Sequence, residues 1–272
     1  MRGHLSDHIT RIPAFNPGPF TGKGNNTYLV AGTVPTLIDA GVGHQRHLAA
    51  LADALRRQGK SLSRVLVTHG HHDHAAGVEA IAEIWPRAEF LKMPWPGVDD
   101  KFAVKWLTLS DGDVVQAGDF KFRVVHSPGH APDHICFLHE ASRIMLCGDL
   151  VIKGGAVMIP VSNGGSLRNY LASLHHVADM SPSQLLPGHG PIIDDPPRVL
   201  REYLDHRRQR EDQIVKALKE GRCTTEAIAN RVYETLERDL RRAAEDTVLA
   251  HLIKLREEKR IVQLDQDRWE LT

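Results

Sequence analysis

Residues 68–77 read THGHHDHAAG and carry four histidines and one aspartate between His69 and His74. The apolar run RVLVTH at 64–69 leads into this stretch and predicts a buried strand that ends at the histidines. Histidines two positions apart on a loop can direct two imidazoles at one ion, and the Asp-His pair that follows can serve a second ion. The spacing H-x-H-x-D-H therefore predicts a metal site at the end of a strand.

Six residues cannot fill two coordination shells, so we expect further ligands at the ends of other strands. His130 lies in SPGHAPDH after FKFRVV, Asp149 lies in CGDLV after RIML, and His189 lies in PGHG after QLL. A glycine beside each of them lets the backbone approach closely. Imidazole and carboxylate ligands suit zinc, iron or manganese. The candidate ligands are His69, His71, Asp73, His74, His130, Asp149 and His189.

The order of these motifs, H-x-H-x-D-H followed by G-H, G-D and P-G-H, resembles the metallo-β-lactamase superfamily over residues 15–195. Asp39, in LIDAG, matches that family's first motif. The resemblance implies one metal at His69, His71 and His130, a second at Asp73, His74 and His189, and Asp149 as the bridge between them. It also implies that Asp39 orients the histidine loop and that His72 does not bind metal. His126 and His134 flank His130, and either could support a ligand or contact substrate.

The family resemblance implies an α+β fold, an αββα sandwich of two mostly antiparallel sheets with helices outside, over residues 1–197. The chain changes character after Pro197, because residues 198–260 are nearly free of strand signals. We expect a long helix that stops at Gly221, helices in 224–233 and 243–260, and two short strands, RIVQL and RWELT. Two helices and a hairpin outline a winged-helix module, so residues 198–272 are predicted to form a small C-terminal winged-helix-like domain.

A dinuclear centre of this kind implies hydrolysis by a hydroxide that bridges two divalent ions, which we expect to be zinc, with manganese or iron as alternatives. Asp73 and Asp149 are the predicted catalytic residues, since either carboxylate can take or steer the released proton. No separate serine or cysteine nucleophile is needed.

Two flanking resemblances point to different substrates. Residues 16–30 and 203–214 resemble a lactamase-beta-like subgroup that includes an endoribonuclease, which favours a phosphodiesterase acting on single-stranded RNA. PGHAPDHICF at 128–137 resembles the corresponding loop of glyoxalase II, which favours a thioesterase or a lactonase with a small acyl substrate. A mononuclear iron sulfur dioxygenase is a less favoured alternative. RNA is the preferred prediction, although the chain has no net charge (34 Lys+Arg and 34 Asp+Glu) to attract phosphates.

Composition predicts a cytoplasmic protein with no membrane association. The three cysteines are widely spaced, the first residues lack an apolar leader, and no apolar run is long enough to cross a membrane. The oligomeric state is left open. The remaining histidines are expected to be solvated or to lie on helix faces: His4, His8, His44, His47, His139, His175, His176, His206 and His251.

Overall fold

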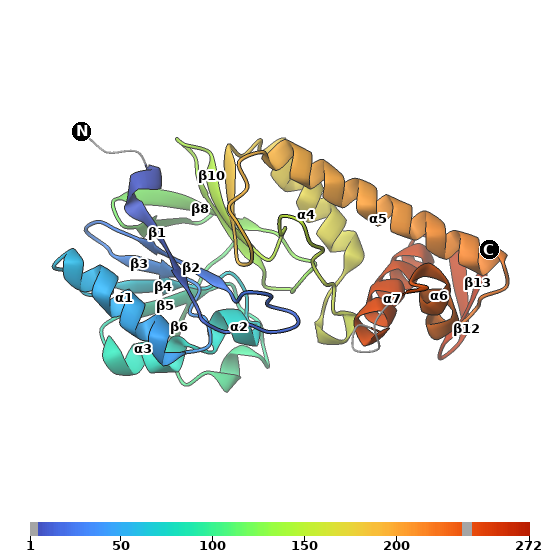
Figure 1. Ribbon diagram of the computed structural model, residues 1–272, viewed down its shortest axis with the longest axis horizontal. Coiled ribbons are helices and arrows are strands. Elements are labelled where there is room, and N and C mark those ends of the chain that lie inside the picture. Colours follow the sequence, from blue (N-terminus) through green and yellow to red (C-terminus); the bar gives the residue numbers. More distant parts are fainter. Residues whose placement is uncertain (1–4, 236–240) are drawn as a thin grey trace.

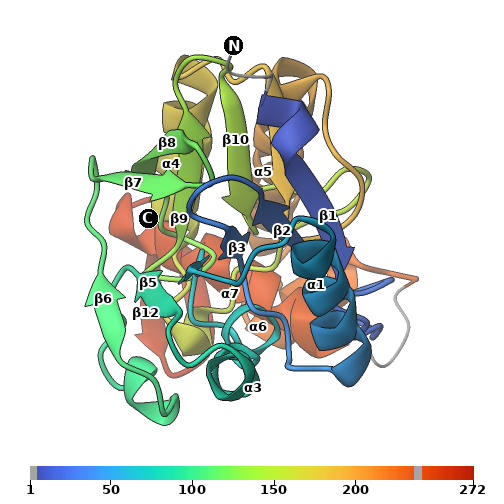
Figure 2. The ribbon, with the colours of Figure 1, turned by 90° about the vertical axis from the view of Figure 1, so that its left-hand side faces the viewer.

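The computed structural model describes residues 5–235 and 241–272, so His4 lies outside the described residues. A six-stranded sheet forms the N-terminal layer (Figures 1 and 2). Its strands, in spatial order, are β1 (Ile9–Pro13), β2 (Asn26–Val30), β3 (Thr36–Ile38), β4 (Arg64–Leu66), β5 (Glu89–Lys92) and β6 (Trp106–Thr108). The first three strands pair antiparallel, whereas β3 to β6 run parallel.

The prediction of two mostly antiparallel sheets is therefore wrong for this first sheet. Parallel neighbours need a crossover connection. Helix α1 (Gln45–Arg57) connects β3 to β4, and helices α2 (His72–Ala75) and α3 (Val78–Ile84) connect β4 to β5. Helix α1 forms where expected: Leu48, Leu51 and Leu55 bury one face, and the chain leaves the helix at Gly59, whose φ of 61° suits glycine.

The second sheet has five strands and is antiparallel except at one edge. In spatial order they are β11 (Gln184–Pro187), β10 (Ile144–Gly148), β9 (Ile135–His139), β8 (Phe120–His126) and β7 (Val114–Ala117). Strand β11 pairs parallel with β10, which requires the crossover through α4 (Leu167–Asp179). Just beyond β11 the chain returns to the first sheet: Asn25 forms an isolated bridge with His189, and the Asn26 N–H donates to the Gly188 carbonyl at 2.7 Å.

Apolar side chains from the inner faces of both sheets form the central core. Tyr28 and Leu66 of the first sheet pack in one cluster with Phe122, Phe137 and Leu146 of the second. A second cluster lies under α1 and α3, and a third lies under α4 and the start of α5 (Pro196–Lys219). Helices thus cover the outer face of each sheet, and the predicted αββα sandwich is confirmed.

Helix α5 runs from the sandwich into the C-terminal part of the chain (Figure 1). Its first half contributes Val199, Leu200 and Tyr203 to the cluster under α4. Its last turns contribute Ile214 and Leu218 to a separate core. The rest of that core comes from α6 (Thr225–Val232), α7 (Arg241–Glu257), β12 (Ile261–Asp265) and β13 (Arg268–Leu271).

Strands β12 and β13 pair only with each other among the described residues, so the C-terminal hairpin is a wing and not an extension of the main sheets. The predicted winged-helix architecture is confirmed. The exact boundary at 197/198 stays a prediction, since α5 belongs to both cores. None of the described helices is long and apolar enough to cross a membrane.

Two histidines correct the sequence expectation. His47 on α1 and His251 on α7 are fully buried. His47 packs inside because it lies four residues before Leu51 on the apolar face of its helix, and Thr27 satisfies one ring nitrogen at 2.9 Å. His251 shares the buried face of α7 with Val248, Leu252 and Leu255.

Candidate metal centre

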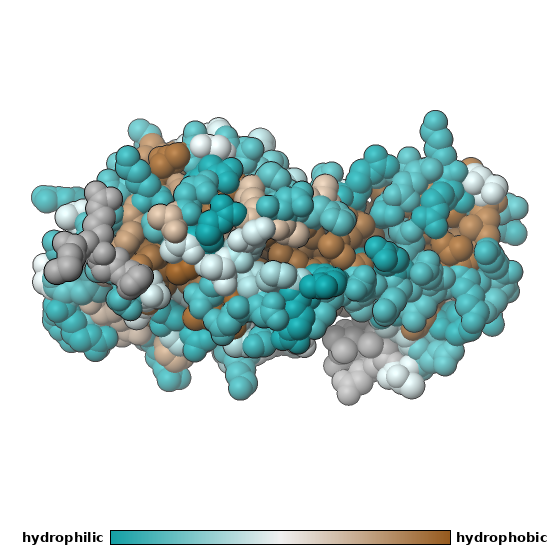
Figure 3. Space-filling view, turned by 90° about the horizontal axis from the view of Figure 1, so that it is seen from above, coloured by the Kyte–Doolittle hydropathy of each residue, from teal (hydrophilic) through white to brown (hydrophobic). Residues whose placement is uncertain are grey.

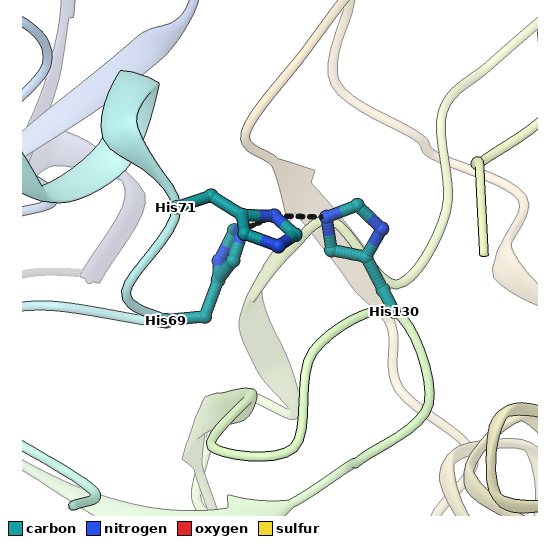
Figure 4. Close-up of side chains that lie close together, drawn as sticks. All are labelled: His69, His71 and His130. Atoms are coloured by element: carbon teal, nitrogen blue, oxygen red, sulfur yellow. Dashed lines mark hydrogen bonds between the residues drawn. The ribbon is translucent and has the colours of Figure 1, made fainter. Parts of the chain in front are cut away.

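The histidine loop begins where β4 ends and enters the one-turn helix α2. His69 and His71 lie on the loop, and in α2 the side chain of His74 is buried while that of His72 is exposed. Figure 4 shows His69 and His71 converging on His130, which comes from the loop after β8 in the other sheet. The site therefore lies where loops of both sheets meet.

The first group of ligand atoms consists of three imidazoles. His69 Nε2 lies 3.1 Å from His71 Nδ1, which lies 2.8 Å from His130 Nε2. Three ring nitrogens that converge so closely have the arrangement of ligands around a single ion.

The second group adds a carboxylate. His189 Nε2 lies 3.3 Å from Asp73 Oδ2, and His74 Nε2 lies 3.6 Å from the same oxygen. Asp149 stands between the two groups, with its carboxylate oxygens 3.4 Å from His74 Nε2, 3.4 Å from His189 Nε2 and 3.5 Å from His130 Nε2. All seven predicted ligands thus come together in one assembly, which we call the His–Asp cluster.

Three of the rings are fixed in orientation through their other nitrogen. His74 Nδ1 donates to Asp39 at 2.8 Å, and His130 Nδ1 donates to the Met158 carbonyl at 2.7 Å. His69 Nδ1 lies 3.0 Å from the Thr68 hydroxyl, which itself donates to Asp39. Each of these contacts turns Nε2 toward the cluster, which is the orientation that metal-binding histidines adopt. Asp39 lies behind the His74 ring and also accepts the Thr68 N–H at 2.7 Å, while its role as an orienting residue stays a prediction from the family resemblance.

His134 supports Asp149. The Asp149 N–H donates to His134 Nε2 at 3.0 Å, and His134 Nδ1 lies 2.9 Å from the Ser127 hydroxyl. Burial lowers the pKa of His134 to about 3, so the ring stays neutral and can accept this hydrogen bond. His126 lies apart from the cluster, with Nε2 2.9 Å from the Pro132 carbonyl.

Two supporting features were missed in the sequence. Asn25 is buried, and its amide donates to Asp73 at 3.0 Å and lies 3.0 Å from His74 Nε2. Lys92 is also buried and pairs with Asp133 at 2.9 Å, while Asp133 accepts the Gly70 N–H at 2.8 Å inside the histidine loop. The available signal for this second feature was a lysine that directly follows the apolar pair Phe90 and Leu91 at the end of a strand.

Charge and space fit a group of cations. Burial would raise the pKa values of Asp73 and Asp149, but the surrounding histidines lower both well below the usual range, so both carboxylates are ionised. Burial would lower the pKa of His189, but Asp149 and Asp73 raise it to about 9. Asp149 Oδ1 has no hydrogen-bond partner among the described residues, although it is buried. Cations would supply that partner and displace protons from the rings.

Glycine keeps the cluster open at one point. A Cβ on Gly188 would lie 2.6 Å from the His74 ring and 2.7 Å from Asp149 Oδ1. Only glycine lets the chain before His189 pass so close to both ligands. The residues present therefore fit a metal-binding role.

Two neighbouring cavities give access to the cluster. The cluster cavity, of about 330 Å³, is lined by predicted ligands together with Phe20, Ile152, residues 156–158 and Pro160. The side cavity, of about 490 Å³, shares His71, His72 and Asn163 with it and extends toward Trp95.

The chain thus combines an αββα sandwich with a His–Asp cluster that is able to bind metal ions. Residues 20–189 match the Metallo-beta-lactamase superfamily, and residues 224–269 match the Beta-lactamase associated winged helix domain. The chain belongs to the metallo-β-lactamase superfamily.

Curated relatives match almost the whole chain. A Beta-lactamase-like protein 2 homolog from Caenorhabditis elegans is 31% identical over 255 residues, which are 92% of this chain and 85% of the relative. This similarity supports the predicted resemblance to the lactamase-beta-like subgroup. The Atrochrysone carboxyl ACP thioesterase of Aspergillus chevalieri is 30% identical over 270 residues, which are 94% of this chain and 83% of the relative.

Solved structures agree with the fold. A metallo-beta-lactamase family protein from Thermus thermophilus has a TM-score of 0.81 at 22% identity, over 98% of this chain and 99% of that chain. TTHA1623 in a di-iron-bound form has a TM-score of 0.56 at 25% identity, over 73% of this chain and 97% of that chain.

Proposed function

We propose that this hydrolase binds two divalent metal ions in the His–Asp cluster and hydrolyses acyl thioesters. The observation that carries the proposal is the lining of the two cavities: among the described residues, Lys101 is the one lysine or arginine that lines either. RNA-binding grooves need several cations for phosphates, whereas an acyl group needs an apolar wall. The related ACP thioesterase supports the same substrate class.

The residues of the His–Asp cluster have separate roles in the proposed reaction. His69, His71 and His130 would hold one ion, Asp73, His74 and His189 the other, with Asp149 between them. Bound divalent ions lower the pKa of a water molecule and polarise a carbonyl. Asp73 and Asp149, both ionised, would orient such a water and steer its proton toward the leaving group. In the overall reaction the water oxygen would bond to the acyl carbon, the carbon–sulfur bond would break, and the thiolate would take up the proton.

A substrate panel tests the reaction class. Metal-loaded protein is assayed with acyl thioesters of N-acetylcysteamine, bis(p-nitrophenyl) phosphate and a labelled single-stranded RNA. We expect thioester turnover at least a hundredfold above phosphodiester turnover, and its loss in an Asp73→Ala/His74→Ala variant. His176→Ala, an exposed position on α4, is the control and should keep wild-type turnover. RNA cleavage without thioesterase activity would reject our proposal in favour of the endoribonuclease prediction from the sequence.

Metal content tests the two-ion assignment. Zinc, manganese and iron(II) are each loaded, and the bound metal is measured by mass spectrometry after gel filtration. We expect two ions per chain with zinc, and one in His189→Ala, because that variant removes a ligand from one group only. Equal metal content in wild type and His189→Ala would contradict the assignment.

A further inference from the structure

Of the residues that line the side cavity, His71 alone belongs to the His–Asp cluster. The volume of the side cavity, about 490 Å³, lies in the range of small-molecule sites. One wall comes from the loop after β5, which contains the short helix η2 (Asp99–Lys101). The cavity is also lined by Asn163, the last residue of the short helix η3 (Val161–Asn163).

The side cavity adjoins the cluster cavity. His71, His72 and Asn163 line both cavities, and the Trp95 ring lies 5.7 Å from the His71 ring. A carbonyl held at the cluster would therefore lie beside a cavity that Trp95 lines.

The wall of the side cavity is apolar and partly aromatic. Trp95, Val98 and Phe102 are half-buried and line the cavity, and Trp95 and Val98 pack on Gly70, where an added Cβ would come within 3.1 Å of each. A flat ring suits a wall of this kind, because stacking on an aromatic side chain adds to the burial of apolar area.

The rim of the side cavity carries one available cation. Glu79 already accepts the Ala103 N–H at 2.7 Å. Lys101 is exposed and forms no ion pair with another described residue. Its ammonium is free to meet an anionic oxygen at the far end of a ligand.

Buried polar contacts hold this wall in place. Lys92 Nζ lies 2.5 Å from Asp99 Oδ1, and Asp99 Oδ2 accepts the Trp95 N–H at 2.6 Å. The loop that carries Trp95 and Val98 is thereby fixed to the strand end beside the histidine loop. A preformed wall of this kind binds a ligand at little cost in ordering the protein.

We propose that the side cavity is the acyl subsite, which selects thioesters of flat, ring-containing acyl groups and places an acidic substituent of the ring beside Lys101. This inference rests on the proposed acyl hydrolase function and adds the class of acyl group. Its test must therefore separate binding in the side cavity from hydrolysis at the cluster.

The kinetic test uses a substitution, Val98→Trp, that places a large side chain in the side cavity. Val98→Trp is compared with Val114→Trp, a matched change on β7 where the valine is 63% exposed. The substrates are the 2-naphthoyl and acetyl thioesters of N-acetylcysteamine. We expect the wild type to favour the naphthoyl thioester at least tenfold in kcat/KM. Val98→Trp should lower this ratio at least tenfold, whereas Val114→Trp should leave it unchanged. Equal kcat/KM for both thioesters in the wild type would overturn the proposal.

The binding test does not depend on turnover. Titration calorimetry measures 2-naphthoate and 2,6-naphthalenedicarboxylate with metal-loaded protein. We expect Val98→Trp to weaken both at least tenfold and Lys101→Met to weaken the dicarboxylate at least threefold more than 2-naphthoate. Trp95→Ala replaces Val98→Trp if circular dichroism shows that the latter is unfolded. Binding that Val98→Trp abolishes, together with no thioesterase activity, would reject the proposed function and keep the subsite. Binding that Val98→Trp leaves unchanged would reject the subsite.

Discussion

At the scale of single residues, Lys92 and Asp133 form an ion pair in the interior behind the histidine loop. Their side chains are 1% and 0% exposed, and Asp133 also holds the Gly70 N–H between His69 and His71. Burial raises the pKa of Asp133 above its usual value, and the Lys92 ammonium offsets part of that rise. Two charges so far from water are tolerated only as a pair, so the position of the histidine loop depends on a lysine that does not touch it.

Breaking this pair should be costly. We expect Lys92→Met to lower the free energy of unfolding by about 3–5 kcal/mol, because it leaves the Asp133 charge buried without a partner. Lys92→Met/Asp133→Asn should recover part of the loss, because an amide oxygen can still accept the Gly70 N–H. Urea unfolding measures both, with the exposed Lys105→Met as control. A loss below about 1 kcal/mol for Lys92→Met would show that the pair does not stabilise the fold.

A buried histidine should make the fold sensitive to acid. Burial, with His44 nearby, lowers the pKa of His47 to about 4, so the folded protein takes up this proton less readily than the unfolded chain. The stabilisation is complete above pH 6.5 and is lost as the pH falls toward 4, on the order of 3 kcal/mol in all. We expect His47→Gln to flatten the fall in unfolding free energy between pH 6.5 and 4. The exposed His176→Gln should keep the wild-type slope, and equal slopes for wild type and His47→Gln would contradict the prediction.

At the scale of elements, α5 supports the cluster through Val157 and Met158, two consecutive residues that line the cluster cavity. The buried Arg207 donates to the Val157 carbonyl, and the next carbonyl, that of Met158, accepts the His130 Nδ1–H. Tyr203, one turn earlier, bonds both backbone groups of Ile152. The helix that leads to the winged-helix domain thus fixes the segment at the mouth of the cluster cavity.

Arg207→Met should weaken metal binding although Arg207 lies outside the cluster. Methionine keeps the apolar stem but loses the contact with Val157, so the Met158 carbonyl no longer holds the His130 ring as firmly. We expect an affinity about tenfold lower, the lower end of the effect of losing a partner behind a ligand. Competition with a chelator measures it. The exposed neighbour Arg208→Met is the control, and unchanged affinity in Arg207→Met would mean that α5 does not position His130.

Sequence patterns predicted the elements that carry periodic apolar residues and the ligands at strand ends. They did not predict the parallel pairing of β3 to β6, because pairing depends on crossovers and not on the strands themselves. His47 and His251 lie on the apolar faces of α1 and α7. The spacing of the apolar residues in these helices therefore indicated that both histidines are buried, but the prediction was made from residue type alone and was wrong. Asn25 and Asp133 support the cluster through contacts distant in sequence, and no local pattern records such contacts.

At the scale of the whole molecule, the core under α4 and the C-terminal core are both built in part by α5, and α7 also adds Ala250 to the core under α4. Tyr203 lies in one core and Ile214 in the other, three turns later on α5. Metal binding at the cluster should therefore also stabilise α5.

Metal removal should loosen more than the cluster. An ion present at about a hundred times its dissociation constant stabilises the folded state by about 2.7 kcal/mol. We expect chelation to lower the melting temperature and to speed hydrogen exchange in the first half of α5 as well as in the histidine loop. Hydrogen exchange with mass spectrometry measures this, with the hairpin β12–β13 as internal reference. Unchanged exchange in α5 after complete metal removal would show that the helix is not coupled to the cluster.

His189 reaches the cluster through its bridge with Asn25, and it is the last of the seven predicted ligands to be synthesised. The chain leaves the ribosome N-terminus first, so His69 to His74 emerge long before β11 can pair with β10. Until residue 189 has left the exit tunnel, a nascent chain can present the three-imidazole group but not the second group. Translation that stalls before that point should yield a chain able to take up one ion, with the second site completed only by the strand that joins its sheet last.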